Sequence, residues 1–281
     1  MSKHVTGIDH VLVAVNDLDI AAATWRRLGF TTTPRGEHAE WGTANHCLMF
    51  GSGYIELIAP VGAGDAADRL RQHLARNGEG MAAVAFGTGD ATAAAQAFRL
   101  AGIAAGEPAA LSRPLTEGAV LRFATVALPA EATPGAASFL CQHLTADLLR
   151  RDEWLHHANG ALGLASVTFV VEDPFAAAPF YERLFGAGTA TPTDNTIAVH
   201  TGHGLLLLCR PDELTQLHPE ADLDPPPRPP AIVAGTIAVA DTDATAAWLE
   251  QQGVPFSRDT EGTIRVSPAD ANGVFLEFAR G

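Results

Sequence analysis

The sequence predicts an α+β fold made of four β-α-β-β-β units that pair into two domains. Three observations predict it: an apolar run of constant length occurs four times, an alanine-rich segment follows each run, and further strand-like runs follow that segment. One unit alone, with one helix on one sheet, leaves a face of the sheet uncovered, so the units are expected to pair. The 281 residues suffice for two such pairs, because domains commonly hold about 100–150 residues.

The repeated run is rich in β-branched and apolar residues, which is typical of a buried strand. Each run ends at an aspartate, whose carboxylate can accept hydrogen bonds from the free N–H groups that begin a helix. A glycine, which tolerates the left-handed conformation at a helix end, follows twelve or thirteen residues later. The runs are 7–17, 80–90, 163–173 and 231–241, and the glycines are Gly29, Gly102, Gly186 and Gly253.

Two more strand-like runs follow each predicted helix, and a short additional helix is expected at 66–77, between the first two units. The later strands are expected at 44–50 and 54–58, 121–128 and 138–143, 196–200 and 205–209, and 263–266 and 274–278.

These elements predict two domains and a connector. The first domain spans 1–145, with units at 5–60 and 80–144, and it is the half expected to hold a site. A connector spans 146–162, and a degenerate second domain spans 163–281, with units at 163–211 and 231–280. We favour pairing of the first unit with the second and the third with the fourth, because units adjacent in the chain usually neighbour each other. Pairing of the first with the fourth and the second with the third stays open.

The charge balance excludes several classes of partner. Lys and Arg total 18 against 32 Asp and Glu, a net charge of −14, which repels nucleic acid and anionic lipid. No apolar run approaches the roughly 18–20 residues that span a bilayer, and the beginning of the chain shows no signal segment. We therefore expect a cytoplasmic monomer or homodimer that binds a small molecule. The three cysteines are far apart and indicate no disulfide framework.

Two strand motifs carry a resemblance to a known superfamily. Gly-Ile-Asp-His-Val stands at 7–11 and Tyr-Ile-Glu-Leu-Ile at 54–58, within the four repeated units. Together they resemble the vicinal oxygen chelate superfamily, which includes glyoxalase I, extradiol dioxygenases and bleomycin-resistance proteins. The segment 38–45 is similar to the His-x-x-x-Gly-Thr-x-Asn pattern of its glyoxalase-like group. The resemblance implies that paired units form a cup and hold a divalent metal on their first and fourth strands.

At those positions the first unit has His10 and Glu56, which the resemblance implies are metal ligands, with Glu56 also catalytic. A buried carboxylate costs several kcal/mol unless it is paired or bound to metal, which supports this interpretation. The alternative is a core histidine and a structural ion pair. The matching first-strand positions of the other units are Ala83, Ser166 and Ala234, none of which suits a metal.

The third ligand depends on how the units pair. If the first two units share a cup, a strict alignment places Cys141 opposite Glu56, and an irregular strand end would bring His143 into the site. Two histidines and one carboxylate suit Fe²⁺ or Mn²⁺, although Ni²⁺ and Zn²⁺ stay open. If the first and fourth units pair instead, Glu277 completes the set.

Three residues before the fourth strand are candidates for substrate binding. His38, Trp41 and Asn45 lie on the loop and strand that lead to the expected cup. The alternative is a turn fixed by Gly42, with solvated histidine side chains.

The resemblance, together with His10 and Glu56, implies a divalent-metal-dependent enzyme of lyase or isomerase type that acts on a small oxygenated metabolite. The alternative is a metal-free binding protein of the bleomycin-resistance type. A ring-cleavage dioxygenase is the third choice, because the chain has only two tyrosines, Tyr54 and Tyr181, and lacks the extradiol signature. The sequence leaves the substrate, the reaction type, the metal and the oligomeric state undetermined.

Overall fold

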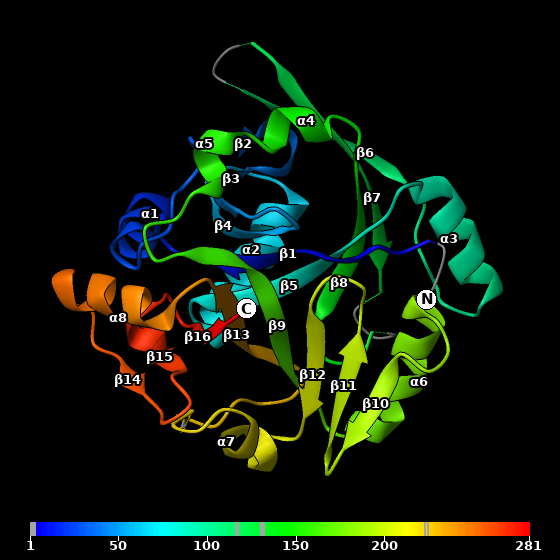
Figure 1. The fold of residues 1–281 in the computed structure, drawn as a ribbon. Coiled ribbons are helices and arrows are strands. Elements are labelled where there is room, and N and C mark those ends of the chain that lie inside the picture. The colour runs from blue at the N-terminus through cyan, green and yellow to red at the C-terminus, as the bar shows by residue number, and fades with distance from the viewer. Residues whose placement is uncertain (1–3, 116–117, 130–132, 222, 224) are drawn as a thin grey trace.

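The computed structural model describes residues 4–115, 118–129, 133–221, 223 and 225–281. Residues 1–3, 116–117, 130–132, 222 and 224, which fall inside the two predicted domains, lie outside this description. The described strands form two eight-stranded mixed sheets with helices packed around them (Figure 1).

The first sheet contains the first two units in the order β2-β3-β4-β1-β5-β8-β7-β6. Within each unit the first strand is parallel to the last, β1 to β4 and β5 to β8, and the two units join through the antiparallel pair β1 and β5. The adjacent pairing of units is therefore the one that the structure has. The strands are β1 Gly7–Ala14, β2 Gly36–His38, β3 Thr43–Met49, β4 Tyr54–Pro60, β5 Gly80–Gly87, β6 Ala109–Pro114, β7 Val120–Leu128 and β8 Ala137–His143.

The second sheet repeats this arrangement with the third and fourth units, in the order β10-β11-β12-β9-β13-β16-β15-β14. Here β9 and β13 form the central antiparallel pair. The strands are β9 Ala161–Val170, β10 Ala190–Thr193, β11 Thr196–His200, β12 Leu205–Cys209, β13 Ala231–Val239, β14 Ser257–Arg258, β15 Ile264–Val266 and β16 Phe275–Arg280.

The predicted helix starts are confirmed in all four units. α1 (Leu18–Arg27), α3 (Ala91–Leu100), α6 (Pro174–Phe185) and α8 (Thr242–Gln251) each begin after an aspartate whose side chain accepts backbone N–H groups. The predicted glycines lie at the helix ends with positive φ. The other helices are α2 Asp65–Asn77, α4 Ala146–Leu149, α5 Asp152–Leu155 and α7 Leu214–Leu217, with short 3₁₀ turns at η1 Ala39–Trp41, η2 Pro211–Glu213 and η3 Pro268–Asp270.

The strand that directly follows each unit's helix has no predicted range. These strands, β2, β6, β10 and β14, form the outer edges of the sheets. They are short and partly exposed, with only two residues in β14. The buried apolar pattern that indicates the central strands is therefore weak in them.

The apolar core continues across both halves of the chain. Phe30 stacks on Phe278 with ring centroids 6.0 Å apart, and Phe86 meets Phe185 edge to face at 5.1 Å. Figure 1 shows α1 beside α8, and the Trp248 indole there donates to the Arg27 carbonyl at 3.1 Å. Each half thus covers apolar surface of the other.

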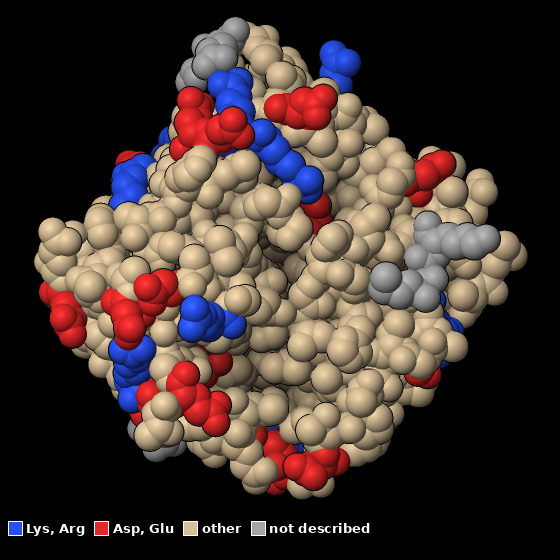
Figure 2. All heavy atoms as spheres, viewed as in Figure 1, with Lys and Arg blue, Asp and Glu red and all other residues tan. Residues whose placement is uncertain are grey.

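On the face drawn in Figure 2, most charged side chains lie near the rim. Acidic side chains occur in several separate groups there, and some of these groups lie next to basic side chains. Among the described residues no helix is long and apolar enough to cross a membrane.

Truncation of the chain after residue 160 should expose the apolar surface that carries Phe30 and Phe86. We expect the remaining first half to aggregate, because an exposed apolar patch of this kind promotes association. Light scattering after size-exclusion chromatography measures this. A soluble monomeric fragment with native-like circular dichroism would show that the first half folds by itself.

Candidate functional site

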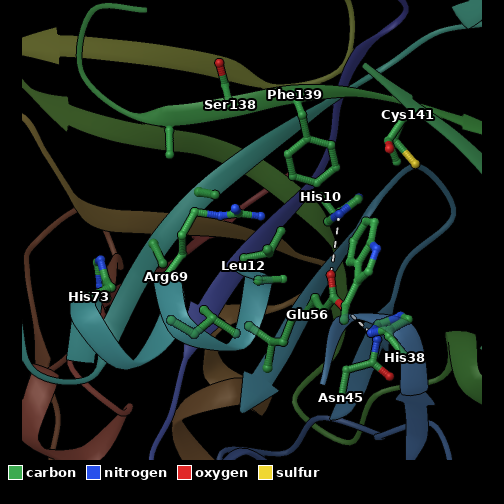
Figure 3. A pocket seen from close by; sticks show the side chains of 18 of the residues that line it. His10, Leu12, His38, Asn45, Glu56, Arg69, His73, Ser138, Phe139 and Cys141 are labelled. Carbon is green, nitrogen blue, oxygen red and sulfur yellow. Dashed lines mark hydrogen bonds and ion pairs between the residues drawn. The ribbon is translucent and has the colours of Figure 1, made fainter. Parts of the chain in front are cut away.

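A cavity of about 690 Å³ lies between the first sheet and helix α2. All five of the predicted site residues from the first unit line it: His10, His38, Trp41, Asn45 and Glu56. Figure 3 shows side chains from β1, β4, β8 and α2 around this space.

His10 and Glu56 converge because β1 and β4 are parallel neighbours. In their register His10 lies opposite Tyr54, and Leu12 lies opposite Glu56. The His10 ring stacks on the Tyr54 ring with centroids 4.3 Å apart, and this contact fixes its plane. His10 Nε2 lies 3.5 Å from Glu56 Oε2, and both residues are buried, with 3% and 6% of their surface exposed (Figure 3).

Asp9 holds the other side of the His10 ring. Its Oδ2 lies 2.6 Å from His10 Nδ1, and its carboxylate also lies 2.9 Å from His143 Nε2. Burial by itself raises the pKa of Asp9, but the hydrogen bonds and charges of His10 and His143 outweigh it and hold that pKa well below its ordinary value. Asp9 is therefore ionised and can only accept a hydrogen bond. Because His10 Nδ1 must donate to it, we place the proton of the His10 ring on Nδ1.

This assignment leaves the lone pair of His10 Nε2 directed at the Glu56 carboxylate. Two acceptor atoms 3.5 Å apart in a buried site repel each other unless a proton or a cation lies between them. The arrangement therefore calls for a positive charge at this point of the cavity.

Asn45 orients Glu56 from the neighbouring strand β3. Its Nδ2 donates to Glu56 Oε1 at 2.5 Å, and its Oδ1 accepts from Arg113 Nη1 at 2.7 Å. Arg113 lies on β6 with only 3% of its surface exposed, and its Nε has no hydrogen-bond partner among the described residues. One oxygen of Glu56 is thus fixed by an amide, and the other faces His10.

His38 and Trp41 form the wall beside this pair. His38 Nδ1 lies 3.0 Å from Thr43 Oγ1, and the His38 and Trp41 rings are 5.9 Å apart. Burial lowers the pKa of His38, so its ring is neutral near pH 7. Gly42 does fix a turn here, with φ +64° and no room for a Cβ against the Ala63 carbonyl. The turn at Gly42 is therefore present, but His38 is buried rather than solvated, and substrate binding by this segment stays a prediction.

Neither of the two candidates for a third ligand lines the cavity. His143 contacts Asp9 and is not among the residues that line the cavity. Glu277 lies in the second sheet opposite Thr236, where it accepts from Arg265 Nε at 3.0 Å and lies 2.9 Å from His218 Nδ1. Burial raises the pKa of Glu277, but these two partners outweigh it and lower the pKa overall. Glu277 is therefore fully partnered within the second half.

Cys141 on β8 belongs to a compact group of possible ligand atoms. Asp9, His10 and Cys141 offer such atoms within 4.8 Å of one another. Burial raises the pKa of Cys141 well above its ordinary value, which disfavours the thiolate that binds metals. The strict alignment of Cys141 with Glu56 is wrong. In the first unit Glu56 pairs with Leu12, and the corresponding pair in the second unit is Phe139 with Ala85. Cys141 pairs with Gly87 instead, two residues farther along the strand.

Asp9 and Arg113 are not among the site residues predicted from the sequence. Asp9 directly precedes His10 in the motif Gly-Ile-Asp-His-Val. A carboxylate next to a predicted histidine ligand could have indicated Asp9, because such carboxylates often orient the histidine ring. Arg113 lies on the edge strand β6, which has no predicted range, and no sequence pattern connects Arg113 with Asn45.

Two family models match the chain. The family described as "Glyoxalase-like domain" matches residues 8–185, and the "Glyoxalase/Bleomycin resistance protein/Dioxygenase superfamily" matches residues 155–278. A comparison with curated proteins gives no match.

Solved structures resemble nearly the whole chain. A hypothetical protein from Staphylococcus aureus has a TM-score of 0.70 at 11% identity, covering 98% of this chain and 99% of that one. A mutant 4-hydroxymandelate synthase from Streptomyces coelicolor has a TM-score of 0.63 at 18% identity, covering 99% and 94%. A methylmalonyl-CoA epimerase from Streptomyces coelicolor is 27% identical over 50% of this chain and 99% of that one, with a TM-score of 0.42. The first two likenesses show the fold.

Asp9→Asn should destabilise the protein, because Asn cannot accept two charge-assisted hydrogen bonds from His10 and His143. We expect a loss of about 1–3 kcal/mol in the free energy of unfolding at pH 7. A carboxyl with a lowered pKa contributes stability above its unfolded pKa, and the contribution is lost as the pH falls through the folded value. The difference from wild type should therefore shrink below the ordinary Asp pKa of 3.8.

Urea unfolding of both proteins between pH 7 and pH 3 measures this difference. Asp147→Asn, at an exposed aspartate, is the control and should change little. Equal stability of wild type and Asp9→Asn at pH 7 would contradict the role given to Asp9.

Proposed function

The chain belongs to the glyoxalase-like domain family within the vicinal oxygen chelate superfamily, and from that premise we propose a divalent-metal-dependent enzyme of lyase or isomerase type. Its substrate is a small oxygenated metabolite bound in the cavity of the first sheet. The observation that carries the proposal is the convergence of His10 Nε2 and Glu56 Oε2 at 3.5 Å inside that cavity.

The donor set of this pair fits a divalent cation. An imidazole nitrogen and a carboxylate oxygen are ligands common to Fe²⁺, Mn²⁺, Ni²⁺ and Zn²⁺. Asp9 accepts from the far nitrogen of His10, as outer carboxylates do beside metal-bound histidines. When bound, the metal would act as a Lewis acid that polarises oxygens of the substrate.

His10 and Glu56 would hold the metal, and His143 would act through Asp9. Because His143 reaches the site by its contact with Asp9, its contribution is to keep that carboxylate ionised and aimed at His10. The positions that these residues leave free are available to substrate oxygens and water.

The remaining residues would bind and orient the substrate. Glu56 Oε2 faces the cavity while Asn45 restrains Oε1, so Glu56 is the group placed to accept a proton from the substrate. His38 and Trp41 would contact the substrate on the same wall, and the neutral His38 ring can donate or accept a hydrogen bond. We further propose that the enzyme works in the cytoplasm, on small molecules rather than nucleic acid or membranes.

One observation favours a second candidate, a metal-free binding protein. Neither of the two predicted third ligands, His143 and Glu277, is among the described residues that line the cavity with His10 and Glu56. In that case a second proton on His10 would neutralise the pair, and the cavity would hold its ligand without chemistry.

Elemental analysis decides between the two candidates. We expect the protein purified without chelator to contain a divalent metal, and His10→Ala and Glu56→Gln to contain far less, because the ligands left cannot hold the ion. His143→Ala should weaken binding less than His10→Ala, since it acts through Asp9.

Glu277→Gln is the matched control. It changes a buried glutamate at the corresponding position of the fourth unit, so it should leave the metal content unchanged. Equal metal in wild type and His10→Ala, or none in wild type after growth with added metals, would favour the binding protein.

A further inference from the structure

Helix α2 presents three basic side chains to the cavity. Arg69, His73 and Arg76 all line it, and their spacing of four and three residues places them on one face of the helix. Figure 3 shows Arg69 extending from α2 across the cavity toward His10 and Phe139, with His73 farther along the helix. The proposed function uses none of these residues.

Arg69 and Arg76 differ in their contacts from Arg71, the other arginine of α2. Neither Arg69 nor Arg76 has a hydrogen bond or ion pair with any described residue, and both are exposed at the mouth of the cavity. Arg71, on another face of the same helix, donates to Asp68 Oδ1 at 2.9 Å and to the Gly62 carbonyl at 2.6 Å. The charge of Arg71 is neutralised by Asp68 within the helix. The guanidinium groups of Arg69 and Arg76 are available to bind a ligand in the cavity.

The cavity is basic within an acidic chain. The described residues that line it include Arg69, Arg76 and Arg113 but a single carboxylate, that of Glu56. The chain as a whole carries a net charge of −14. A concave site with charge opposite to its surroundings attracts anions and raises their local concentration. Burial lowers the pKa of His73, so the arginines supply this charge near neutral pH.

The rest of the lining is largely apolar. Leu12, Ile58, Leu111, Phe123 and Phe139 come from five strands of the sheet and face the same space. With a volume of about 690 Å³, the cavity is in the range of sites for drug-sized ligands and far exceeds a three-carbon metabolite. It therefore suits a ligand with an apolar body.

We propose that the cavity takes an amphipathic anion, whose negatively charged oxygens bind Arg69 and Arg76 and whose apolar body packs against the strands. This inference rests on the proposed function and deepens it by giving the substrate class: an apolar acid, either a carboxylate or a phosphate ester. Guanidinium groups suit both kinds of anion because they form paired hydrogen bonds with two oxygens.

Two fluorescent probes that differ in charge test the proposal. 8-Anilinonaphthalene-1-sulfonate is an apolar anion, and N-phenyl-1-naphthylamine has nearly the same apolar body without the sulfonate. We expect the double variant Arg69→Gln/Arg76→Gln to bind the sulfonate about tenfold more weakly than wild type, with affinity for the neutral probe unchanged. Arg71→Gln, on another face of the same helix, should change neither affinity.

Further arms distinguish the alternatives. Displacement of the sulfonate by octanoate or by octyl phosphate identifies the preferred anion. Ala83→Phe, which fills part of the cavity, should weaken both probes and shows that they bind there. An unchanged affinity of the double variant for the sulfonate, or an equal loss for both probes, overturns the proposal.

The test is independent of metal and turnover. Probe binding is measured with and without a chelator, so sulfonate binding that does not depend on Arg69 and Arg76 speaks against this inference alone. Absence of metal in the wild-type protein speaks instead against the proposed function.

Discussion

The parallel register of β1 against β4 is the constraint on which the site depends. It brings together two residues that are 46 positions apart in the chain and points both into one cavity. Because side chains alternate along a strand, a slip of one residue would turn Glu56 to the other face of the sheet and remove it from His10. Burial of both groups is unfavourable without partners, so Asp9 and Asn45 are as necessary to the arrangement as the strands.

Two glutamates in corresponding places show why the first half is the functional candidate. Glu56 faces Leu12 on the first strand of its unit, and Glu277 faces Thr236 in the same way. Glu277 has Arg265 and His218 as partners, so the protein itself neutralises its charge. Glu56 has an amide and a histidine whose proton is directed elsewhere. The same fold position is closed in one sheet and left open to a ligand in the other.

Much of the fold could be predicted from the sequence because its signals are local. The aspartates that cap the helices and the apolar runs of the central strands depend on neighbouring residues alone, and both are confirmed. The partnership of Asp9 with His10 was harder to see. Adjacent residues of a regular strand point to opposite faces, but the β1–β5 register shifts between Ile8 and His10 and lets the two side chains meet. A pattern of alternation cannot reveal such an irregularity.

The basic face of helix α2 could not be predicted as part of the cavity, because this helix lies outside the repeated units. The helix itself was expected at 66–77, but its position depends on tertiary packing, in which Ala67 and Leu70 are its buried residues. Repeated units of the same fold supply the scaffold and the buried pair His10 and Glu56. Helix α2, which joins the first two units, adds Arg69 and Arg76 at the mouth of the cavity, so under the proposal this helix would select the ligand without any change in the strands that carry His10 and Glu56.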